Sequence, residues 1–487
     1  MSRDQQEKVL ASVPRQLFIG GGWRPPKSGR TLAVENPATG GVIAEVGDGG
    51  PDDARAALDA AAAAQPGWAA TAPRERGEIL RRAYQLLTER SDDLALLMTL
   101  EMGKPIAESA GEIAYAAEFF RWFAEEAVRI DGRFSVNPSG KGRLLVLRQP
   151  VGPCLLITPW NFPMAMGTRK IGPALAAGCT MVLKPAQLTP LSSLALAELL
   201  SDAGLPPGVL NVVTTSQAGE TLAPVLTDSR LRKLSFTGST EVGQSLAAKA
   251  AGQLLRVSME LGGNAPFLVF GDADVSAAVS GAVLAKLRNG GEACTAANRF
   301  YVHRSVAPRF TELLVNRFAA IPVRPGTDPE SQLGPLIDDR QRQKVVELVE
   351  DAVNRGARCL IGGRPLDGPG YFYPPTVLVD VPPDARLLRE EIFGPVAPIV
   401  TFDDEEEAVA QANDTEFGLV AYLFTRGLDQ ALRVSEALET GMVGLNQGLV
   451  SNPAAPFGGV KHSGYGREGG HEGINEYVEV KYVAVSL

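Results

Sequence analysis

The chain has 487 residues, a length that corresponds to about three ordinary structural units. Hydrophobic residues make up 45% and charged residues 21%, and Gly and Pro stay below the share typical of low-complexity chains, which excludes disorder, collagen and coiled coil as the main architecture. The net charge of −9 disfavours binding to a nucleic-acid backbone.

The first residues do not have the pattern of a signal peptide, and the cysteine pattern indicates a reducing compartment. Residues 1–14 carry charges and lack the apolar core of a signal peptide, and the apolar stretch 172–183 is shorter than the roughly 18 residues that a membrane helix needs. Four cysteines lie far apart without a CxxC pair, and three histidines form no HxxxH pair. We therefore expect a cytoplasmic protein with no membrane contact and no metal.

The first part of the chain is predicted to be mostly helical. Residues 52–128 contain an Ala-rich segment, Asp53–Ala64, and an amphipathic run, Arg74–Leu97, both with helical periodicity. The segment 129–150 is interrupted by Gly and Pro and has strand character over 142–147. We expect an extended hairpin or arm at this place.

From residue 153 to 270, short apolar segments alternate with helical patterns. The predicted strands are Cys154–Thr158, Thr180–Lys184, Leu210–Val213, Lys233–Phe236 and Val257–Leu261. Helices such as Gly167–Ala177 and Ser192–Asp202 separate them, which predicts βαβ units and a parallel sheet. A second α/β stretch runs from Pro266 to about Val450, and the alternating tail Tyr477–Leu487 predicts an edge or intersubunit strand.

Two motifs follow predicted strands of this region. Asn161 lies between Pro159 and Pro163, where a rigid turn would let its amide donate to a developing oxyanion, although a plain turn is the alternative. The segment Phe236–Gly243 passes from a strand into a helix through small residues. Its backbone N–H groups could bind a pyrophosphate, although such turns are often simple helix caps.

Two further residue types could perform acid–base and nucleophilic chemistry. Glu260 ends a strand beside two glycines, either as a general base or as a solvated strand-end charge. Cys294 follows Gly290 and Gly291, which indicates a tight turn that exposes the thiol. One interpretation places it at a helix start, where the dipole would lower its pKa. The alternative for this cysteine is a small buried side chain. Glu391 opens a segment that by itself has the pattern of a helix-to-loop junction.

Together these motifs resemble the aldehyde dehydrogenase superfamily, in the same order along nearly the whole chain. The 34-residue spacing from Glu260 to Cys294 agrees with the family pattern. The resemblance implies that Cys294 attacks the aldehyde carbon and that Asn161 and the Cys294 backbone N–H form an oxyanion hole. It further implies that Glu260 activates the water that hydrolyses the resulting thioester. The cofactor contacts that it implies are Trp160, Lys184, Gln187, Gly238, Ser239, Glu391 and Phe393.

The fold implied by the resemblance is α/β: a Rossmann-like cofactor domain, an α/β catalytic domain and a β-arm for oligomerisation. We expect the cofactor domain at 1–128 and 151–259, the catalytic domain at 260–450, and the oligomerisation segments at 129–150 and 475–487. An unpaired arm on a monomer would leave an open strand edge, so a homo-oligomer, a dimer or a tetramer, is expected.

Within the superfamily, Pro456–Gly459 and Gly464–Gly469 are similar to segments of succinate-semialdehyde dehydrogenases. The residues that hold the substrate carboxylate in that group correspond to Arg169, Arg288 and Ser451. Two guanidinium groups in one pocket are costly without an anion, although either could instead pair with Asp or Glu. The resemblance thus implies succinate semialdehyde as substrate. Glutarate semialdehyde, broad specificity, acyl transfer to coenzyme A and a non-catalytic structural role are the alternatives.

The cofactor preference is predicted from Gln187, three residues after Lys184. Many NAD-preferring relatives carry Glu there, and a carboxylate would repel the additional phosphate of NADP. Gln187 removes that charge while Lys184 can attract the phosphate, so NADP is favoured and some use of NAD remains. Ala296 occupies the position where some relatives carry a second cysteine, so a disulfide switch with Cys294 cannot form.

Overall fold

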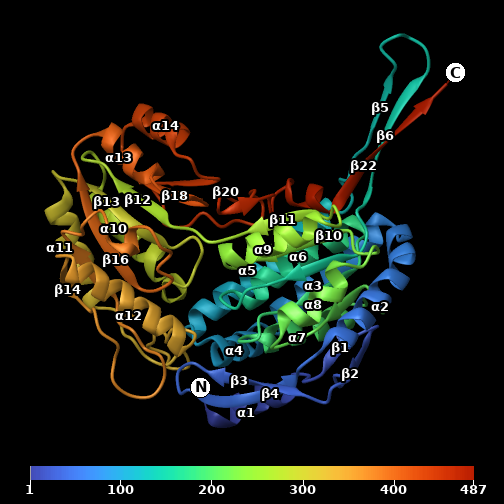
Figure 1. Cartoon of the computed structure of the whole chain (residues 1–487), viewed down its shortest axis with the longest axis horizontal. Helices are drawn as coiled ribbons and strands as arrows, with labels where there is room; N and C mark the ends of the chain where they lie inside the picture. The colour runs from blue at the N-terminus through green and yellow to red at the C-terminus, as the bar shows by residue number, and fades with distance from the viewer. Residues whose placement is uncertain (1, 487) are drawn as a thin grey trace.

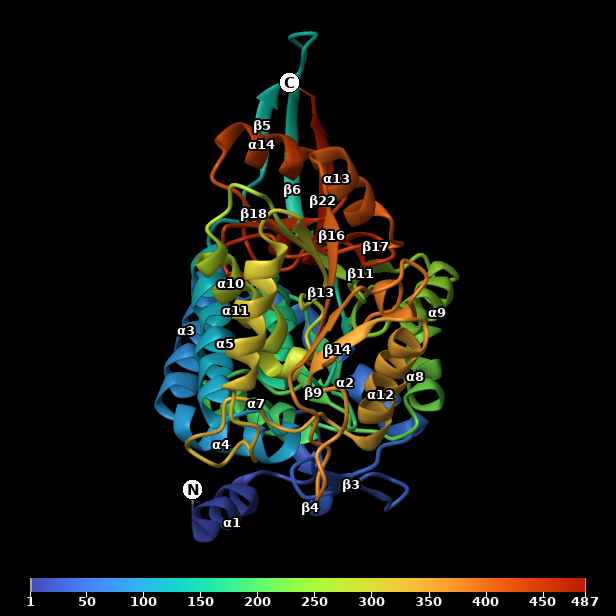
Figure 2. The ribbon, with the colours of Figure 1, turned by 90° about the vertical axis from the view of Figure 1, so that its left-hand side faces the viewer.

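The computed structural model describes residues 2–486. Two α/β bodies lie side by side, and a narrow three-stranded arm projects from the body that carries most of the first half of the chain (Figure 1). The arm stands at the end opposite the amino-terminal helix α1 (Arg3–Ser12), as the second view also shows (Figure 2). None of the helices within the described range is long and apolar enough to cross a membrane.

The first body is built on an eight-stranded sheet of order β2-β1-β9-β8-β7-β10-β11-β21. Its strands are β1 (Leu17–Ile19), β2 (Gly22–Arg24), β7 (Cys154–Ile157), β8 (Met181–Lys184), β9 (Leu210–Val212), β10 (Lys233–Thr237), β11 (Arg256–Glu260) and β21 (Gly464–Tyr465). The five central strands, β9, β8, β7, β10 and β11, are parallel to one another. At the edges, β1 pairs antiparallel with β9 and with β2, and β21 pairs antiparallel with β11. The strand order runs outwards in both directions from β7 and β10, so their carboxyl ends form the switch point where such sheets bind ligands.

Helices cover both faces of this sheet because its central strands are apolar on both sides. In β7, Leu155 and Ile157 belong to one apolar core with helix α2, whereas Leu156 belongs to the core on the other face. Such strands read as continuous apolar runs. The helices of this body are α2 (Pro51–Ala70), α3 (Pro73–Glu89), α4 (Ser91–Met102), α5 (Ile106–Glu126), α6 (Pro163–Ala177), α7 (Pro190–Asp202), α8 (Ala218–Leu226) and α9 (Thr240–Ala251).

The second body is built on a seven-stranded sheet of order β14-β15-β16-β13-β12-β18-β19, parallel except for β14. Its strands are β12 (Ala265–Val269), β13 (Ala297–His303), β14 (Arg358–Ile361), β15 (Thr376–Val379), β16 (Val396–Phe402), β18 (Val420–Phe424) and β19 (Met442–Leu445). Its helices are α10 (Val275–Leu287), η1 (Arg288–Gly291), α11 (Ala307–Ala319), α12 (Asp339–Asn354), η2 (Arg386–Leu388), α13 (Glu405–Asn413) and α14 (Leu428–Ala437).

The arm is a three-stranded antiparallel sheet of order β22-β6-β5. It consists of β5 (Arg133–Val136), β6 (Arg143–Pro150) and β22 (Val478–Val485), and β22 follows the short helix η3 (Gly473–Tyr477). The predicted hairpin and the predicted carboxy-terminal strand are therefore confirmed and pair with each other; Leu487 lies outside the described residues. Two small strand pairs complete the fold, β3 (Thr31–Asn36) with β4 (Gly41–Gly47) and β17 (Phe417–Gly418) with β20 (Val460–Lys461).

The five strands predicted between 153 and 270 are confirmed as β7 to β11, with ends that differ by one residue. The amphipathic run Arg74–Leu97 is helical, as predicted, but it is divided between two helices. Arg90 leaves helical geometry at φ −99° and ψ 15° and separates α3 from α4. The chain turns there because α4 packs inside the body, where every residue from Leu94 to Met102 is buried.

Candidate active site

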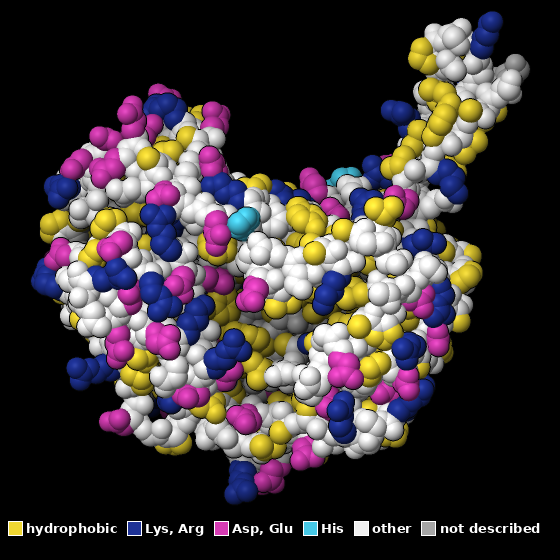
Figure 3. Space-filling model, viewed as in Figure 1, with side chains coloured by type: hydrophobic (Ala, Val, Ile, Leu, Met, Phe, Trp, Pro, Cys, Tyr) yellow, Lys and Arg dark blue, Asp and Glu magenta, His cyan; other side chains and the backbone are white. Residues whose placement is uncertain are grey.

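A cavity of about 780 Å³ lies between the two bodies, at the carboxyl ends of β7 and β10. The space-filling view shows the molecule hollowed at this place (Figure 3). Cavities of this size are typical of ligand sites, and the sheet's switch point is where α/β folds place them. The topology of the first sheet and the position of α12 thus create the site.

Ten of the predicted site residues line this cavity, namely Trp160, Asn161, Arg169, Gly238, Ser239, Arg288, Cys294, Glu391, Phe393 and Ser451. Three predicted residues, Lys184, Gln187 and Glu260, are not part of its wall. Lys184 ends β8 and is half-buried, which lowers its pKa to about 8 through desolvation, whereas Gln187 is exposed in the loop that follows. The cavity therefore brings together residues that lie nearly 300 positions apart in the chain.

Cys294 reaches the cavity through a sharp turn within η1. Asn289, Gly290 and Gly291 have positive φ angles of 54°, 66° and 77°, and a Cβ on Gly291 would lie 2.3 Å from the Gly394 carbonyl oxygen. The expectation of a helix start at Cys294 is wrong, because the turn leads into β13 instead. The expected lowering of the thiol pKa is also wrong. Burial and the charge of Glu391 raise the pKa of Cys294 to about 12, against the opposing charge of Arg169.

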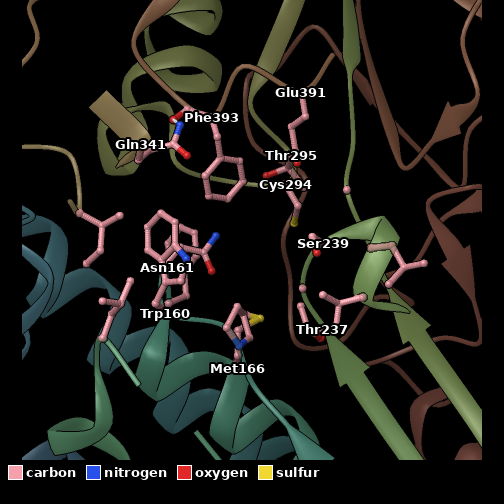
Figure 4. A pocket seen from close by; sticks show the side chains of 18 of the residues that line it. Trp160, Asn161, Met166, Thr237, Ser239, Cys294, Thr295, Gln341, Glu391 and Phe393 are labelled. Carbon is pink, nitrogen blue, oxygen red and sulfur yellow. Dashed lines mark hydrogen bonds between the residues drawn. The ribbon is translucent and has the colours of Figure 1, made fainter. Parts of the chain in front are cut away.

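Asn161 lies in the loop between β7 and α6, and its side chain extends into the same space as Cys294 (Figure 4). Its Nδ2 donates a hydrogen bond of 2.9 Å to the backbone oxygen of Glu292, and its Oδ1 has no partner among residues 2–486. An amide N–H beside a thiol is the arrangement that can stabilise an oxyanion formed by attack of that thiol on a carbonyl.

Glu260, at the end of β11, lies behind the cavity wall and is 2% exposed. Neither carboxyl oxygen has a hydrogen-bonding partner within the described chain. Burial, together with the nearby charge of Glu468, raises the pKa of Glu260 well above its ordinary value, while Lys170 and Arg169 act in the opposite direction. A buried carboxyl group with a raised pKa and no fixed partner is suited to accept a proton.

One side of the cavity has the features of an anion site. Ser239 is the N-cap of α9 but makes no side-chain hydrogen bond to the helix, so the first backbone N–H groups are available to another acceptor. A Cβ on Gly238 would lie 2.5 Å from the Phe236 ring, so only glycine fits there. The Thr237 hydroxyl is buried without a partner in the part of the chain that the structure describes.

The opposite side is formed by Glu391 and Phe393. The ring of Phe393 meets the ring of Trp160 edge-on at 5.4 Å, and Figure 4 shows both beside the open space. Glu391 Oε1 accepts a hydrogen bond from the Gly263 N–H at 3.1 Å, and burial raises the pKa of Glu391 to about 7. A flat site between an aromatic edge and a carboxylate suits a ring joined to a sugar.

Arg169 and Arg288 bring two guanidinium groups to the cavity, each against an aromatic ring. Arg169 stacks 4.1 Å from the Phe457 ring centre, and Arg288 lies 4.7 Å from that of Phe162. Arg169 is 2% exposed and donates to the Tyr115 hydroxyl at 2.6 Å, while its Nε has no partner within residues 2–486. Arg169 also lies 3.8 Å from the Glu468 carboxylate, so part of its charge is compensated, and its unused Nε–H remains available to an anionic ligand.

Sequence reasoning missed several lining residues. Among them are Tyr115, Phe162, Met166, Thr295, Gln341 and Phe457. Phe457 lies in the segment Pro456–Gly459, which is similar to one in succinate-semialdehyde dehydrogenases, so the sequence did indicate a place near the site for this residue. Gln341, in the first turn of α12, donates a hydrogen bond of 2.7 Å from Nε2 to the backbone oxygen of Phe393. Tyr115 lies in the middle of α5, where the sequence pattern shows only another helical residue.

Comparison with known proteins agrees with this geometry. A model of the "Aldehyde dehydrogenase family" matches residues 23–483. A succinate-semialdehyde dehydrogenase of Paenarthrobacter nicotinovorans is 59% identical over 91% of this chain and 99% of its own length. A glutarate-semialdehyde dehydrogenase of Pseudomonas putida is 52% identical over 97% and 98% of the two chains. A crystal structure of an Escherichia coli NADP-dependent enzyme superposes with a TM-score of 0.96 at 51% identity, covering 98% of both chains.

Proposed function

The chain belongs to the aldehyde dehydrogenase family, and from this premise we propose that it oxidises an ω-carboxylated aldehyde, succinate semialdehyde, to the corresponding acid. The observation that carries the proposal is the presence of two arginines, Arg169 and Arg288, in the cavity of Cys294. The unpartnered Nε of the buried Arg169 supports an anionic group on the substrate. The 59% identical relative acts, by its name, on this aldehyde.

In the proposed reaction, Cys294 Sγ forms a bond to the aldehyde carbon and the carbonyl oxygen becomes an oxyanion. Asn161 Nδ2 and the backbone N–H of Cys294 would donate to that oxygen. Because the pKa of the thiol is raised to about 12, the thiol proton would pass to a water molecule in the cavity as the carbon–sulfur bond forms. When bound, the nicotinamide cofactor supplies a hydride acceptor for the substrate carbon, which leaves a thioester on Cys294.

Glu260 would complete the cycle as general base. It removes a proton from water, the resulting hydroxide attacks the thioester carbon, and the carbon–sulfur bond breaks to release the acid and the Cys294 thiolate. The carboxyl group lies behind the wall in this structure and must turn towards the cavity. The lack of a hydrogen-bonding partner for either oxygen among the described residues leaves it free to do so.

NADP is the cofactor that we propose as preferred, with some use of NAD. The free N–H groups at the start of α9 and the unpartnered Thr237 hydroxyl fit a pyrophosphate, and the carboxylate of Glu391 fits a ribose. The proposed contacts are Trp160, Lys184, Gln187, Gly238, Ser239, Glu391 and Phe393. Gln187 places no negative charge near a 2′-phosphate, and a solved relative of 51% identity is NADP-dependent by its title.

Glutarate semialdehyde is the second candidate, since a 52% identical relative is named for it and one methylene is worth only about 1–3 kcal/mol. A panel of aldehydes of different chain length, with and without a terminal carboxylate, separates the two by kcat/KM. Activity must also depend on Cys294: if Cys294→Ala reduces cofactor as fast as the wild type, the mechanism is wrong. Activity that requires added coenzyme A would instead indicate an acylating enzyme.

We further propose that 1–128 and 151–259 bind the cofactor, that 260–450 carry the catalytic residues, and that 129–150 and 475–487 join subunits of a dimer or tetramer. The arm supports this assignment because it exposes large apolar side chains, which soluble surfaces usually bury against a partner. They are Phe134, Val136, Val480 and Tyr482. A reducing compartment such as the cytoplasm is proposed because Cys294 must remain a free thiol.

A further inference from the structure

A buried ion pair lies directly behind the loop that carries Asn161. Lys104, in the loop before α5, donates from Nζ to Glu112 Oε2 at 2.6 Å, and both side chains are 1% exposed. The same Nζ donates to the backbone oxygen of Asn161 at 2.7 Å and lies 4.3 Å from the Phe162 ring centre. The ammonium group thus has a partner for each of its N–H directions, and one of them is the Asn161 peptide.

The carboxylate of this pair holds the helix that follows Asn161. The N-cap of α6, Phe162, makes no side-chain hydrogen bond to the helix. Instead, Glu112 Oε1 accepts from the backbone N–H groups of Met164 and Ala165 at 3.0 and 3.1 Å. A carboxylate at a helix N-terminus is favourable both as a cap and for the helix dipole. The turn between β7 and α6 is therefore held from one side by Lys104 and from the other by Glu112.

Helix α5, which carries Glu112, also holds the turn that leads to Cys294. Glu108, one turn before Glu112 on α5, accepts from the Asn289 N–H at 2.8 Å. Asn289 Nδ2 donates to the Asn161 and Glu292 backbone oxygens, each at 3.0 Å. The Glu292 oxygen also accepts from Asn161 Nδ2. The amide of Asn161 and the turn leading to Cys294 are thus fixed relative to each other through one hydrogen-bonded unit.

We propose that Lys104 is a positioning residue for the reaction, acting through its hydrogen bond to the Asn161 carbonyl to hold the Asn161 amide where the oxyanion forms. This inference rests on the proposed role of Asn161. An ion pair that served folding alone could bond the backbone anywhere, whereas this one bonds the peptide of the proposed oxyanion donor. Preorganised donors stabilise an oxyanion only while their geometry is held, so loss of the anchor weakens the donor without removing it.

A double-mutant cycle tests the proposal by the single-turnover rate of cofactor reduction at saturating NADP. Asn161→Ala is expected to reduce this rate about 100-fold, and Lys104→Met about 10-fold. In the combined variant Lys104→Met/Asn161→Ala, the rate should stay within about threefold of Asn161→Ala alone, because the anchor has nothing left to hold. The dissociation constant for NADP, measured by fluorescence titration, should remain unchanged in Lys104→Met.

Lys233→Met is the matched control. Lys233 is also fully buried, but its Nζ interacts with Ser258 and Glu476 instead of the Asn161 loop, so its effect should multiply with that of Asn161→Ala. If Lys104→Met fails to fold because Glu112 is left unpaired, Lys104→Met/Glu112→Gln removes both charges, and the same loss and coupling are expected. The proposal would be overturned if the rate losses of Lys104→Met and Asn161→Ala multiplied in the combined variant, or if Lys104→Met/Glu112→Gln kept the full rate. It would also be overturned if Lys233→Met showed the same coupling to Asn161→Ala as Lys104→Met. An undiminished rate in Asn161→Ala would overturn the role of Asn161 itself.

Discussion

Replacement of Arg169 by Met tests the proposed recognition of the substrate carboxylate most directly. Arg169 is 2% exposed, keeps one N–H on Tyr115 and has an unused Nε, so at least one charge-assisted hydrogen bond is available to a carboxylate. Such a bond contributes about 1.5–3 kcal/mol, and a buried site offers little screening. We therefore expect kcat/KM for succinate semialdehyde to fall on the order of 100-fold, which corresponds to about 3 kcal/mol. Propanal has no carboxylate, and its kcat/KM should change by less than about threefold.

The control for this variant is Arg299→Met. Arg299 is also buried, and its guanidinium bonds to backbone oxygens of Asn264, Gln411 and Ala412 outside the cavity wall. Its loss should lower stability and affect both aldehydes to the same degree. Steady-state rates followed by the absorbance of the reduced cofactor give both ratios. Equal losses on succinate semialdehyde and propanal in Arg169→Met would refute the recognition of a carboxylate by this residue.

Three further outcomes are expected. Since burial raises the pKa of Cys294 to about 12, its alkylation by iodoacetamide, measured on the Cys294 peptide in the free enzyme, should increase about tenfold per pH unit between pH 7 and 10; a plateau near pH 9 would contradict this. Gln187→Glu should shift the ratio of kcat/KM for NAD and NADP at least about tenfold towards NAD, since a carboxylate repels the 2′-phosphate; an unchanged ratio would show that charge at this position has no influence. Phe134→Asp with Tyr482→Asp should reduce the mass in light scattering towards that of one chain, and an unchanged mass would exclude the exposed face of the arm from the interface.

The five central strands of the first sheet, β7 to β11, could be predicted because each is a short segment between turns and is largely buried. In Cys154–Ile157 every residue is apolar and buried, whereas β10 is buried along its whole length although it also contains Lys233 and Ser235. The amino-terminal strands β1 to β4 were not predicted. β1 has only three residues and pairs with β9, nearly 200 positions later in the chain. β3 and β4 form a small local pair outside the two main sheets, in which only Leu32 and Val34 of β3 are buried, so the apolar signal is short. The separation of α3 from α4 at Arg90 carries no Gly or Pro signal and follows from packing.

The candidate site could be located from the sequence because its residues lie in short motifs after strands. What the motifs could not indicate is the electrostatic state of these residues. The pKa of Cys294 depends on Glu391, nearly 100 positions later, and that of Glu260 depends on Glu468, about 200 positions later. Tyr115 was missed because helical periodicity does not show which face of a helix meets an active-site loop. Lys104 was missed because it lies in the loop before α5, and its contacts with Glu112 and the Asn161 carbonyl arise only in the folded chain.

The charges around Glu260 agree with an anionic substrate. Lys170 pairs with Glu468 at 2.6 Å, and Arg169 lies 3.8 Å from the same carboxylate. Burial and the charge of Glu468 raise the pKa of Glu260, so these four side chains form one coupled, buried group. A substrate carboxylate would bind the Arg169 Nε, which has no partner within residues 2–486, whereas an uncharged aldehyde would leave this N–H unused in a site with little solvent. We therefore expect the preference for a carboxylated aldehyde to depend on the Arg169 side chain together with the charges that surround it.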